Sequence, residues 1–267
     1  MTWPFKKKPR RGMGWLRDPH DPSDVQRAFY ATGEVPTSAD LTSHVTEILD
    51  QGSTSSCVAH AFAYAIMVAE SQAGLRYDPI SREYLYYNAR AITGDQDRDE
   101  GTYLRNAAKS LVVMGAAPES SWPFNPKTLN KAPGIGAHML AHPRRNGTYS
   151  KVFGSGSARC NSIKRALAAG HAVCAGFDVT NDIFDVTDGI VEKPISDSAV
   201  VGGHALAIVG FDMDGFRIVN SWNTSWGDRG FATFSNEYVG STYCSDIYIV
   251  QGWDRLKQIP VAQQAIA

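Results

Sequence analysis

The order of hydrophobic and polar positions divides the chain into a helical first part and a second part rich in strands. Residues 57–70 are alanine-rich and apolar on nearly every side, which predicts a buried helix that Gly74 can end. Two further helical patterns cover 81–91 and 103–114. The proline-containing stretch 118–143 is expected to be a loop.

Beyond this loop the hydrophobic period shifts towards two residues, which indicates strands. The expected strands are 148–153, 172–179, 205–211, 216–219, 230–234 and 247–250, and one short helix is expected at 162–169. Helices followed by strands are typical of an α+β protein with two segregated lobes. The predicted division is an N-terminal extension (1–42), a helical left lobe (43–140), a β-rich right lobe (141–255) and a C-terminal tail (256–267).

Composition and charge exclude several classes of protein. Hydrophobic residues make up 43% of the 267 positions and charged residues 20%, as in ordinary globular proteins. The net charge of -1 favours no nucleic acid, and the basic run 6–11 is short and broken by proline, so we interpret it as a solvated tail. The longest apolar stretch, 61–69, is too short to cross a bilayer, and no secretory signal follows the basic run. We therefore expect neither a nucleic-acid nor a membrane partner.

The four cysteines stand at positions 57, 160, 174 and 244, and none belongs to a CxxC pair. This count is low for a disulfide-stapled secreted protein, so we expect mostly reduced thiols and a cytoplasmic or virion-associated location. Cys160 and Cys174 could form a disulfide, and the sequence leaves that question open.

Cys57 is the strongest candidate for a nucleophile. It opens the predicted buried helix, where unpaired backbone N–H groups and the positive end of the helix dipole favour a thiolate. The alternative is a buried structural cysteine, but the polar loop 52–56 places the sulfur at a lobe surface. Gln51, six residues upstream, can turn its amide towards the same point.

His204 is the best candidate for a base among the seven histidines. It follows two glycines and opens an apolar strand, so its ring can face a cleft. Sixteen residues later the next strand ends at Asn220, and a hairpin of this length returns the chain beside His204. Asn220 can then accept a hydrogen bond from one ring nitrogen and leave the other facing the thiol.

Other histidines are weaker candidates. His60 follows Cys57 by one helical turn, where the positive helix end disfavours an imidazolium, so we interpret it as a packed helix residue. His138 and His142 have the i, i+4 spacing of a metal site but no evident third ligand. We expect no metal and no cofactor.

Together these residues resemble the papain family of cysteine peptidases. The family has Gln-Gly, then Ser-Cys at the head of the central helix, then Gly/Asn-His-Ala, then Asn-Ser-Trp-Gly and Trp-Gly. The matching positions are Gln51–Gly52, Ser56–Cys57, Gly203–Ala205, Asn220–Trp222 and Trp226–Gly227. The interval of 147 residues from Cys57 to His204 fits the spacing of about 130–150 expected for the downstream partners. The resemblance covers about residues 45 to 250, and segments 14–18 and 81–88 are similar to the bacterial and viral branch.

The resemblance implies a two-lobed fold and the hydrolysis of peptide bonds through an acyl-enzyme. The substrate would be a peptide or protein, and no cofactor would be needed. Cys57 and His204 would form a thiolate–imidazolium pair oriented by Asn220. Gln51 would stabilise the oxyanion together with the backbone N–H of Cys57.

The resemblance also implies residues that line the substrate site. Trp222 would cover the hydrogen bond between the catalytic asparagine and histidine, and Ser56 and Gly101 would lie along the substrate channel. Asn223 stands where the family has glycine, but asparagine tolerates a left-handed backbone, so we expect the turn to form.

Other features leave alternatives open. The family's disulfide cysteine is replaced by Thr54, and a tryptophan by Val58. No long inhibitory prosegment is recognisable in residues 1–42, which we expect to pack along the cleft or behind the lobes. A non-hydrolytic structural protein, for example of a viral particle, and a transpeptidase both stay possible on the sequence alone.

Overall fold

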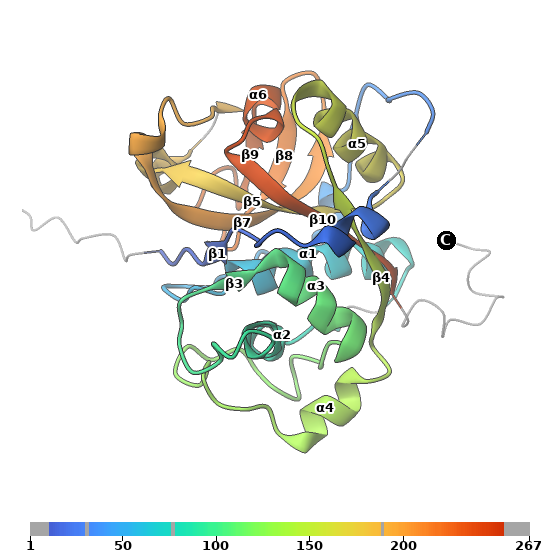
Figure 1. Ribbon diagram of the computed structural model, residues 1–267, viewed down its shortest axis with the longest axis vertical. Helices are drawn as coiled ribbons and strands as arrows, with labels where there is room; N and C mark the ends of the chain where they lie inside the picture. Colours follow the sequence, from blue (N-terminus) through green and yellow to red (C-terminus); the bar gives the residue numbers. More distant parts are fainter. Residues whose placement is uncertain (1–10, 30–31, 76–77, 188–189, 254–267) are drawn as a thin grey trace, which may run out of the picture.

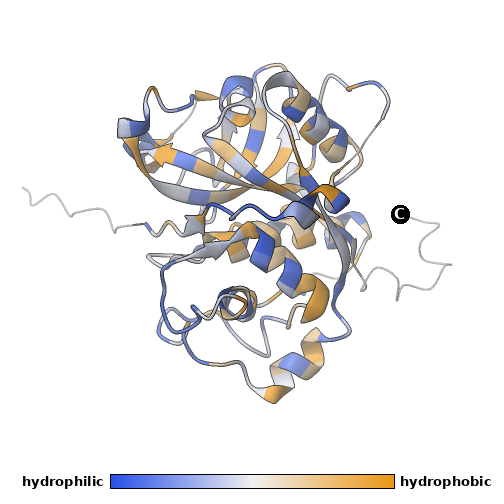
Figure 2. Ribbon diagram, viewed as in Figure 1, coloured by the Kyte–Doolittle hydropathy of each residue, from blue (hydrophilic) through white to orange (hydrophobic). Residues whose placement is uncertain are grey.

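The helical half of the molecule surrounds one buried helix. The computed structural model describes residues 11–29, 32–75, 78–187 and 190–253 (Figure 1). Helix α1 (Cys57–Gln72) is buried along nearly its whole length, because its alanines let neighbouring elements approach closely. Helices α2 (Arg82–Ala91) and α3 (Leu104–Val113) pack against α1 and against each other. In Figure 2 the ribbon of α3 alternates between hydrophilic and hydrophobic segments, as expected for a helix with one face in the core.

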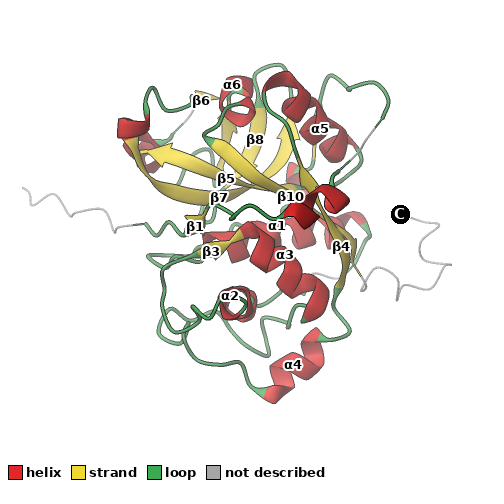
Figure 3. Ribbon diagram, viewed as in Figure 1, coloured by secondary structure: helices red, strands yellow, loops and turns green. Residues whose placement is uncertain are grey.

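The other half is a twisted sheet covered by two helices (Figure 3). The strand order is β4-β10-β5-β7-β8-β9-β6, and the short strand β2 pairs with β7. Their bounds are β2 (Ala39–Asp40), β4 (Asn146–Val152), β5 (Val173–Thr180), β6 (Ile190–Val191), β7 (Val200–Phe211), β8 (Phe216–Val219), β9 (Phe231–Phe234) and β10 (Cys244–Trp253). Neighbouring strands are antiparallel, except for β6 and β9, which run parallel. Helices α5 (Gly156–Ala168) and α6 (Asn236–Gly240) lie beyond the sheet.

The two halves share one core, in which α1 packs against the central strands β5 and β7. Short 3-10 helices complete the described residues: η1 (Pro22–Arg27), η2 (Thr42–His44), η3 (Asn181–Asp185) and η4 (Asp197–Ala199). The α+β class and the two-lobed arrangement predicted from the pattern are confirmed. No helix within the described ranges has the length and apolarity that crossing a membrane requires.

The N-terminal segment runs between the two halves (Figure 1). Residues 11–18, which we call the strap, contain strand β1 (Trp15–Leu16). This strand pairs in parallel with β3 (Thr102–Tyr103), next to the start of α3. Trp15 is buried in the shared core, so the strap belongs to the packed structure. We expected the extension to pack along the cleft or behind the lobes, and the strap packs along the cleft between the two halves (Figure 1).

One predicted loop contains a helix. We expected 118–143 to be irregular, but α4 (Ile135–Ala141) forms between Pro133 and Pro143. Its residues Ala137 and Ala141 pack on Tyr84 of α2, which supplies a tertiary contact that the local sequence does not reveal.

Further expectations concern the cysteines, the turn at Asn223, helix α5 and the two ends of the chain. All four cysteines are free, so Cys160 and Cys174 do not form a disulfide. Asn223 adopts a left-handed backbone (φ 57°), which confirms the expected turn. Helix α5 begins earlier than the predicted 162–169. Most of the basic run and the tail 256–267 lie outside the described residues.

Candidate active site

Cys57 lies at the first position of α1 and is fully buried. Its Sγ accepts a hydrogen bond from the backbone N–H of Ala205 on β7 at 3.4 Å. The backbone N–H of Gly14 in the strap also donates to this sulfur. Burial raises the pKa of Cys57 to about 11, although these backbone donors favour the thiolate.

His204 and Asn220 face each other across the β7–β8 hairpin, as the spacing predicted. His204 Nε2 donates to Asn220 Oδ1 at 2.8 Å, and the backbone N–H of Ser221 donates to the same oxygen at 2.7 Å. His204 Nδ1 has no hydrogen-bond partner among the described residues. Nε2 is occupied by Asn220, so Nδ1 is the ring nitrogen left for another partner, and the neighbouring residue Ala205 contacts the Cys57 sulfur.

The imidazole is also buried, and burial lowers the pKa of His204 to about 4 against the opposing effect of the Asn220 hydrogen bond. The raised pKa of Cys57 and the lowered pKa of His204 both favour a neutral thiol and a neutral imidazole in this conformation. The resemblance implied a thiolate–imidazolium pair instead. The difference has a physical cause, since both groups are fully buried in this conformation.

Trp222 covers the histidine. Its ring stacks on the His204 ring with centroids 4.6 Å apart. The Phe184 ring also stacks on Trp222, with centroids 5.3 Å apart. Tyr64 of α1 donates to the backbone oxygen of Asn220 at 3.0 Å and accepts from the Leu49 N–H at 2.7 Å. These contacts fix the orientation of the hairpin end that carries Asn220.

Gln51 is held in one orientation next to Cys57. Its Oε1 accepts from the Ser221 hydroxyl at 2.6 Å, and its Nε2 donates to the Thr54 carbonyl at 2.7 Å. The same nitrogen donates to the carbonyl oxygen of Gly12 in the strap at 3.1 Å. The amide of Gln51 therefore already binds a carbonyl oxygen supplied by another segment.

Glycines allow the strap to lie directly on the site. A Cβ at Gly12 would overlap the Thr54 carbonyl oxygen, and a Cβ at Gly14 would overlap that of Ser55. Gly101, with a φ of +94°, packs against the Gly14 carbonyl with no space for a side chain. This contact places Gly101 beside the segment that fills the site.

Trp15 is the largest strap side chain and occupies a pocket with a glycine floor. Its ring lies on Gly176 of β5, and an added Cβ at Gly203 of β7 would come within 2.9 Å of the ring. Trp15 is only 4% exposed. The strap therefore closes the site with backbone over the sulfur and an aromatic ring beside it.

Ser56 and His60 contact each other at the start of α1. Ser56 Oγ contacts Thr54 Oγ1 at 2.7 Å and His60 Nδ1 at 3.3 Å. His60 is fully buried, packs edge-on against Phe124, and has a pKa lowered to about 3 by burial. The interpretation of His60 as a packed helix residue is confirmed.

Sequence reasoning expected the extension along the cleft or behind the lobes, but it did not identify the contacts of the strap with the site, and it gave no role to Tyr64 or Ser221. The signal for the strap was present as Gly-Met-Gly-Trp at 12–15, where two glycines precede an aromatic residue. His138 bonds the Tyr84 hydroxyl at 2.9 Å. Across the described part of the chain no cluster of histidine, cysteine and acidic side chains is suited to a metal ion.

Comparisons with known proteins identify relatives. Residues 35–247 match the family model described as papain family cysteine protease. An uncharacterized peptidase C1-like protein of Acanthamoeba polyphaga mimivirus is 34% identical over 215 residues, which cover 76% of this chain and 69% of that protein. A cathepsin L-like proteinase of Fasciola hepatica is 25% identical, over 70% of this chain and 56% of that protein. The crystal structure of xylellain, a cysteine protease from Xylella fastidiosa, matches with a TM-score of 0.79 and 28% identity, over 92% of this chain and 98% of xylellain.

Proposed function

This chain belongs to the papain family of cysteine proteases, and we propose that Cys57, His204 and Asn220 are the residues with which it hydrolyses peptide bonds. As a cysteine-type peptidase it acts on peptides or proteins. The observation that carries the assignment is the hydrogen bond of 2.8 Å from His204 Nε2 to Asn220, which leaves Nδ1 for the thiol.

In the first half of the reaction the Cys57 sulfur attacks the substrate carbonyl carbon while His204 Nδ1 takes the thiol proton. The imidazolium then gives this proton to the leaving amine, and an acyl-enzyme remains. In the second half His204 removes a proton from water, the resulting hydroxide attacks the thioester, and Cys57 is released. Asn220 keeps the ring oriented throughout, and Trp222 keeps water from their hydrogen bond.

The oxyanion is stabilised by Gln51 Nε2 and the backbone N–H of Cys57. Gln51 supports this role because Ser221 and Thr54 hold its amide in place before substrate arrives. A substrate carbonyl oxygen would replace the Gly12 oxygen that this amide binds in the present structure. Gly101 would line the channel that the strap now fills, and Ser56 would contribute through its backbone, since its side chain faces Thr54.

Access is the condition for this chemistry. Cys57, His204 and Gln51 are each 0% exposed, so a substrate reaches them only after the strap moves. The structure therefore represents a closed state of the peptidase.

A peptide-library cleavage assay tests the proposal. We expect cleavage by the unmodified protein, stronger cleavage by Gly14→Ala, and none by Cys57→Ala. Cys160→Ala is the matched control, because it removes a buried thiol on α5, far from the site in sequence and in the fold. If folded Gly14→Ala cleaved no peptide, or Cys57→Ala cleaved as well as its parent, the assignment would be wrong.

A further inference from the structure

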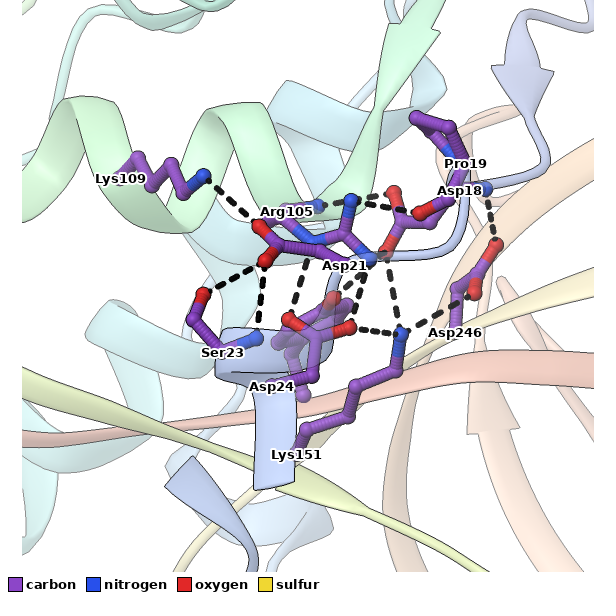
Figure 4. Close-up of polar contacts among 10 residues, drawn as sticks. Asp18, Pro19, Asp21, Ser23, Asp24, Arg105, Lys109, Lys151 and Asp246 are labelled. Carbon is purple, nitrogen blue, oxygen red and sulfur yellow. Dashed lines mark hydrogen bonds and ion pairs between the residues drawn. The ribbon is translucent and has the colours of Figure 1, made fainter. Parts of the chain in front are cut away.

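Just beyond Trp15 the N-terminal segment enters a largely buried group of charged side chains (Figure 4). This ionic cluster consists of Asp18 and Asp24 from the N-terminal segment, Arg105 of α3, Lys151 of β4 and Asp246 of β10. Neither the catalytic mechanism nor the core packing uses these groups, which raises the question of their role.

Asp24 makes the strongest contacts in the cluster. Arg105 donates to its two oxygens through Nε at 3.0 Å and Nη2 at 2.6 Å. Lys151 Nζ donates to the same carboxylate at 2.9 Å. Burial opposes ionisation, but these hydrogen bonds keep the pKa of Asp24 below its ordinary value.

Asp18 connects the strap itself to the cluster. Its side chain is fully buried and accepts from the Arg105 backbone N–H at 3.3 Å, in the first turn of α3. Tyr248 donates its hydroxyl proton to Asp18 at 2.5 Å. The Asp18 N–H in turn donates to Asp246 Oδ2 at 2.7 Å.

The cluster holds three carboxylates but two cations, so one negative charge is left in excess. Asp24 binds both cations below 3.1 Å, whereas Asp18 and Asp246 make only longer ion pairs of 3.6–3.8 Å. We take Asp246 as the surplus anion, because it is paired with Lys151 alone and lies beside Asp18. Burial and the neighbouring Asp18 charge raise the pKa of Asp246. The backbone of Asp246 is left-handed (φ 50°), a conformation that asparagine adopts as readily as aspartate.

The elements that supply Arg105, Lys151 and Asp246 do not need the cluster to stay together. Strands β4 and β10 pair over six registered positions, and α3 packs into the core through Leu104 and Leu111. What the cluster adds is the attachment of the N-terminal segment. Gly14, which donates to the catalytic sulfur, is four residues from Asp18, so an attached strap stays within roughly 14 Å of the site.

The opposite end of the strap is held less firmly. Arg11 bonds Asp50 at 2.8 Å, but the aspartate is 41% exposed, and such surface pairs contribute little. Gly12 adds backbone bonds to Gly52 and the Gln51 amide. Outside its middle part, where Trp15 is buried and β1 pairs with β3, the strap thus has a weak end at Arg11 and a strong end in the cluster.

We propose, on the basis of the function proposed above, that the ionic cluster regulates this peptidase by fixing the strap's effective concentration at the active site, with Asp24 favouring closure and the surplus carboxylate of Asp246 opposing it. An opened strap remains attached and competes with substrate as part of the same molecule. Loss of a cation–carboxylate contact shifts the equilibrium towards the open strap. Loss of the surplus negative charge shifts it towards the closed strap.

Two amide substitutions in the same cluster should therefore act in opposite directions. The full-length chain is compared as Asp24→Asn, Asp246→Asn and the matched control Asp97→Asn, an exposed carboxylate on a loop of the helical half. The alkylation rate of Cys57, followed by mass spectrometry of its peptide at pH 7, reports strap opening without reference to catalysis. The other three cysteines are also buried, and the alkylation of each is followed on its own peptide.

We expect Asp24→Asn to alkylate on the order of tenfold faster than the parent, as for the loss of one charge-assisted contact. Asp246→Asn should alkylate several-fold slower, and Asp97→Asn should match the parent. Peptide hydrolysis should follow the same order. Lys151→Gln serves as a second opening variant if Asp24→Asn fails to fold, and circular dichroism establishes folding in each case.

The outcomes separate the two proposals. Equal alkylation in all cluster variants, while Gly14→Ala reacts faster, would overturn the role of the cluster and leave the strap as the cover. Faster alkylation by both amide variants would overturn the opposing role of Asp246. If alkylation follows the expected order but no variant hydrolyses peptides, the cluster controls the strap and the proposed catalytic function fails.

Discussion

At the scale of single residues, burial controls the chemistry of the site. Cys57 and His204 have the partners expected of a nucleophile and a base, yet both are removed from water in the closed state. Charging either group there would cost desolvation energy that the Asn220 bond and the backbone donors only partly offset. Burial therefore favours the neutral thiol and the neutral imidazole in this conformation.

This preference for the neutral form predicts an unusual pH profile for the thiol. Burial raises the pKa of Cys57 to about 11 in this conformation. The neutral thiol therefore stabilises closure fully at pH values below the ordinary pKa of a thiol. This stabilisation is lost as the pH rises through 11. The loss amounts to about 1.4 kcal/mol per pH unit across that window. Alkylation of the unmodified protein should thus increase up to about pH 11, whereas Gly14→Ala should react at much lower pH. A shared midpoint near 8.5 in both proteins would contradict the effect of the strap.

Gln51 allows a second test at this scale. Removal of its amide in Gln51→Ala should lower kcat by about a hundred- to a thousandfold, because the donor acts on the oxyanion more than on the bound substrate. KM should change little, measured in the Gly14→Ala background so that the strap does not limit access. A rise in KM with unchanged kcat would instead indicate a role in substrate binding.

At the scale of elements, the closed state depends on close backbone approach. Gly12 and Gly14 let the strap lie on the 53–55 loop, and pairing with β3 fixes its register. Alanine at either position requires displacement of backbone, which cannot move as an exposed side chain can.

Gly14→Ala should therefore open the strap and raise kcat/KM for peptide hydrolysis by tenfold or more, if overlap costs at least about 1.4 kcal/mol. Gly136→Ala in α4 is the matched control, since its added Cβ meets nothing within 4 Å. An equal kcat/KM for the two variants would show that the strap does not limit the reaction.

The elements differ in how well the sequence predicts them. Helix α1 and the β7–β8 hairpin follow from long apolar patterns, and these two place Cys57, His204 and Asn220. Strand β1 has only two residues, and its partner β3 lies 87 positions away, so no local period could indicate it. Helix α4 was missed for a similar reason, because its contact with Tyr84 is tertiary. The approach of these three residues to one another was thus predictable, whereas the register of the segment that covers them was not.

At the scale of the whole molecule, the strap connects the two halves. Trp15 packs on the sheet through Gly176 and Gly203, while its backbone pairs with Thr102 of the helical half. Beyond it Arg17 bonds Asp178 of β5, and Asp18 reaches α3 and β10. The same segment that covers Cys57 therefore also joins the two halves, which couples access to the sulfur with stability.

This coupling predicts that Trp15→Ala changes stability and reactivity together. Removal of a buried tryptophan typically costs about 3–5 kcal/mol, and for a chain of this size about 2–4 °C of Tm is lost per kcal/mol. We expect a Tm lower by roughly 6–20 °C, because ring contacts with both central strands disappear. Cys57 alkylation should accelerate at the same time. Leu16→Ala is the matched control, since that neighbouring side chain is 38% exposed against 4% for Trp15. A lower Tm without faster alkylation would show that Trp15 supports the core but does not hold the strap closed.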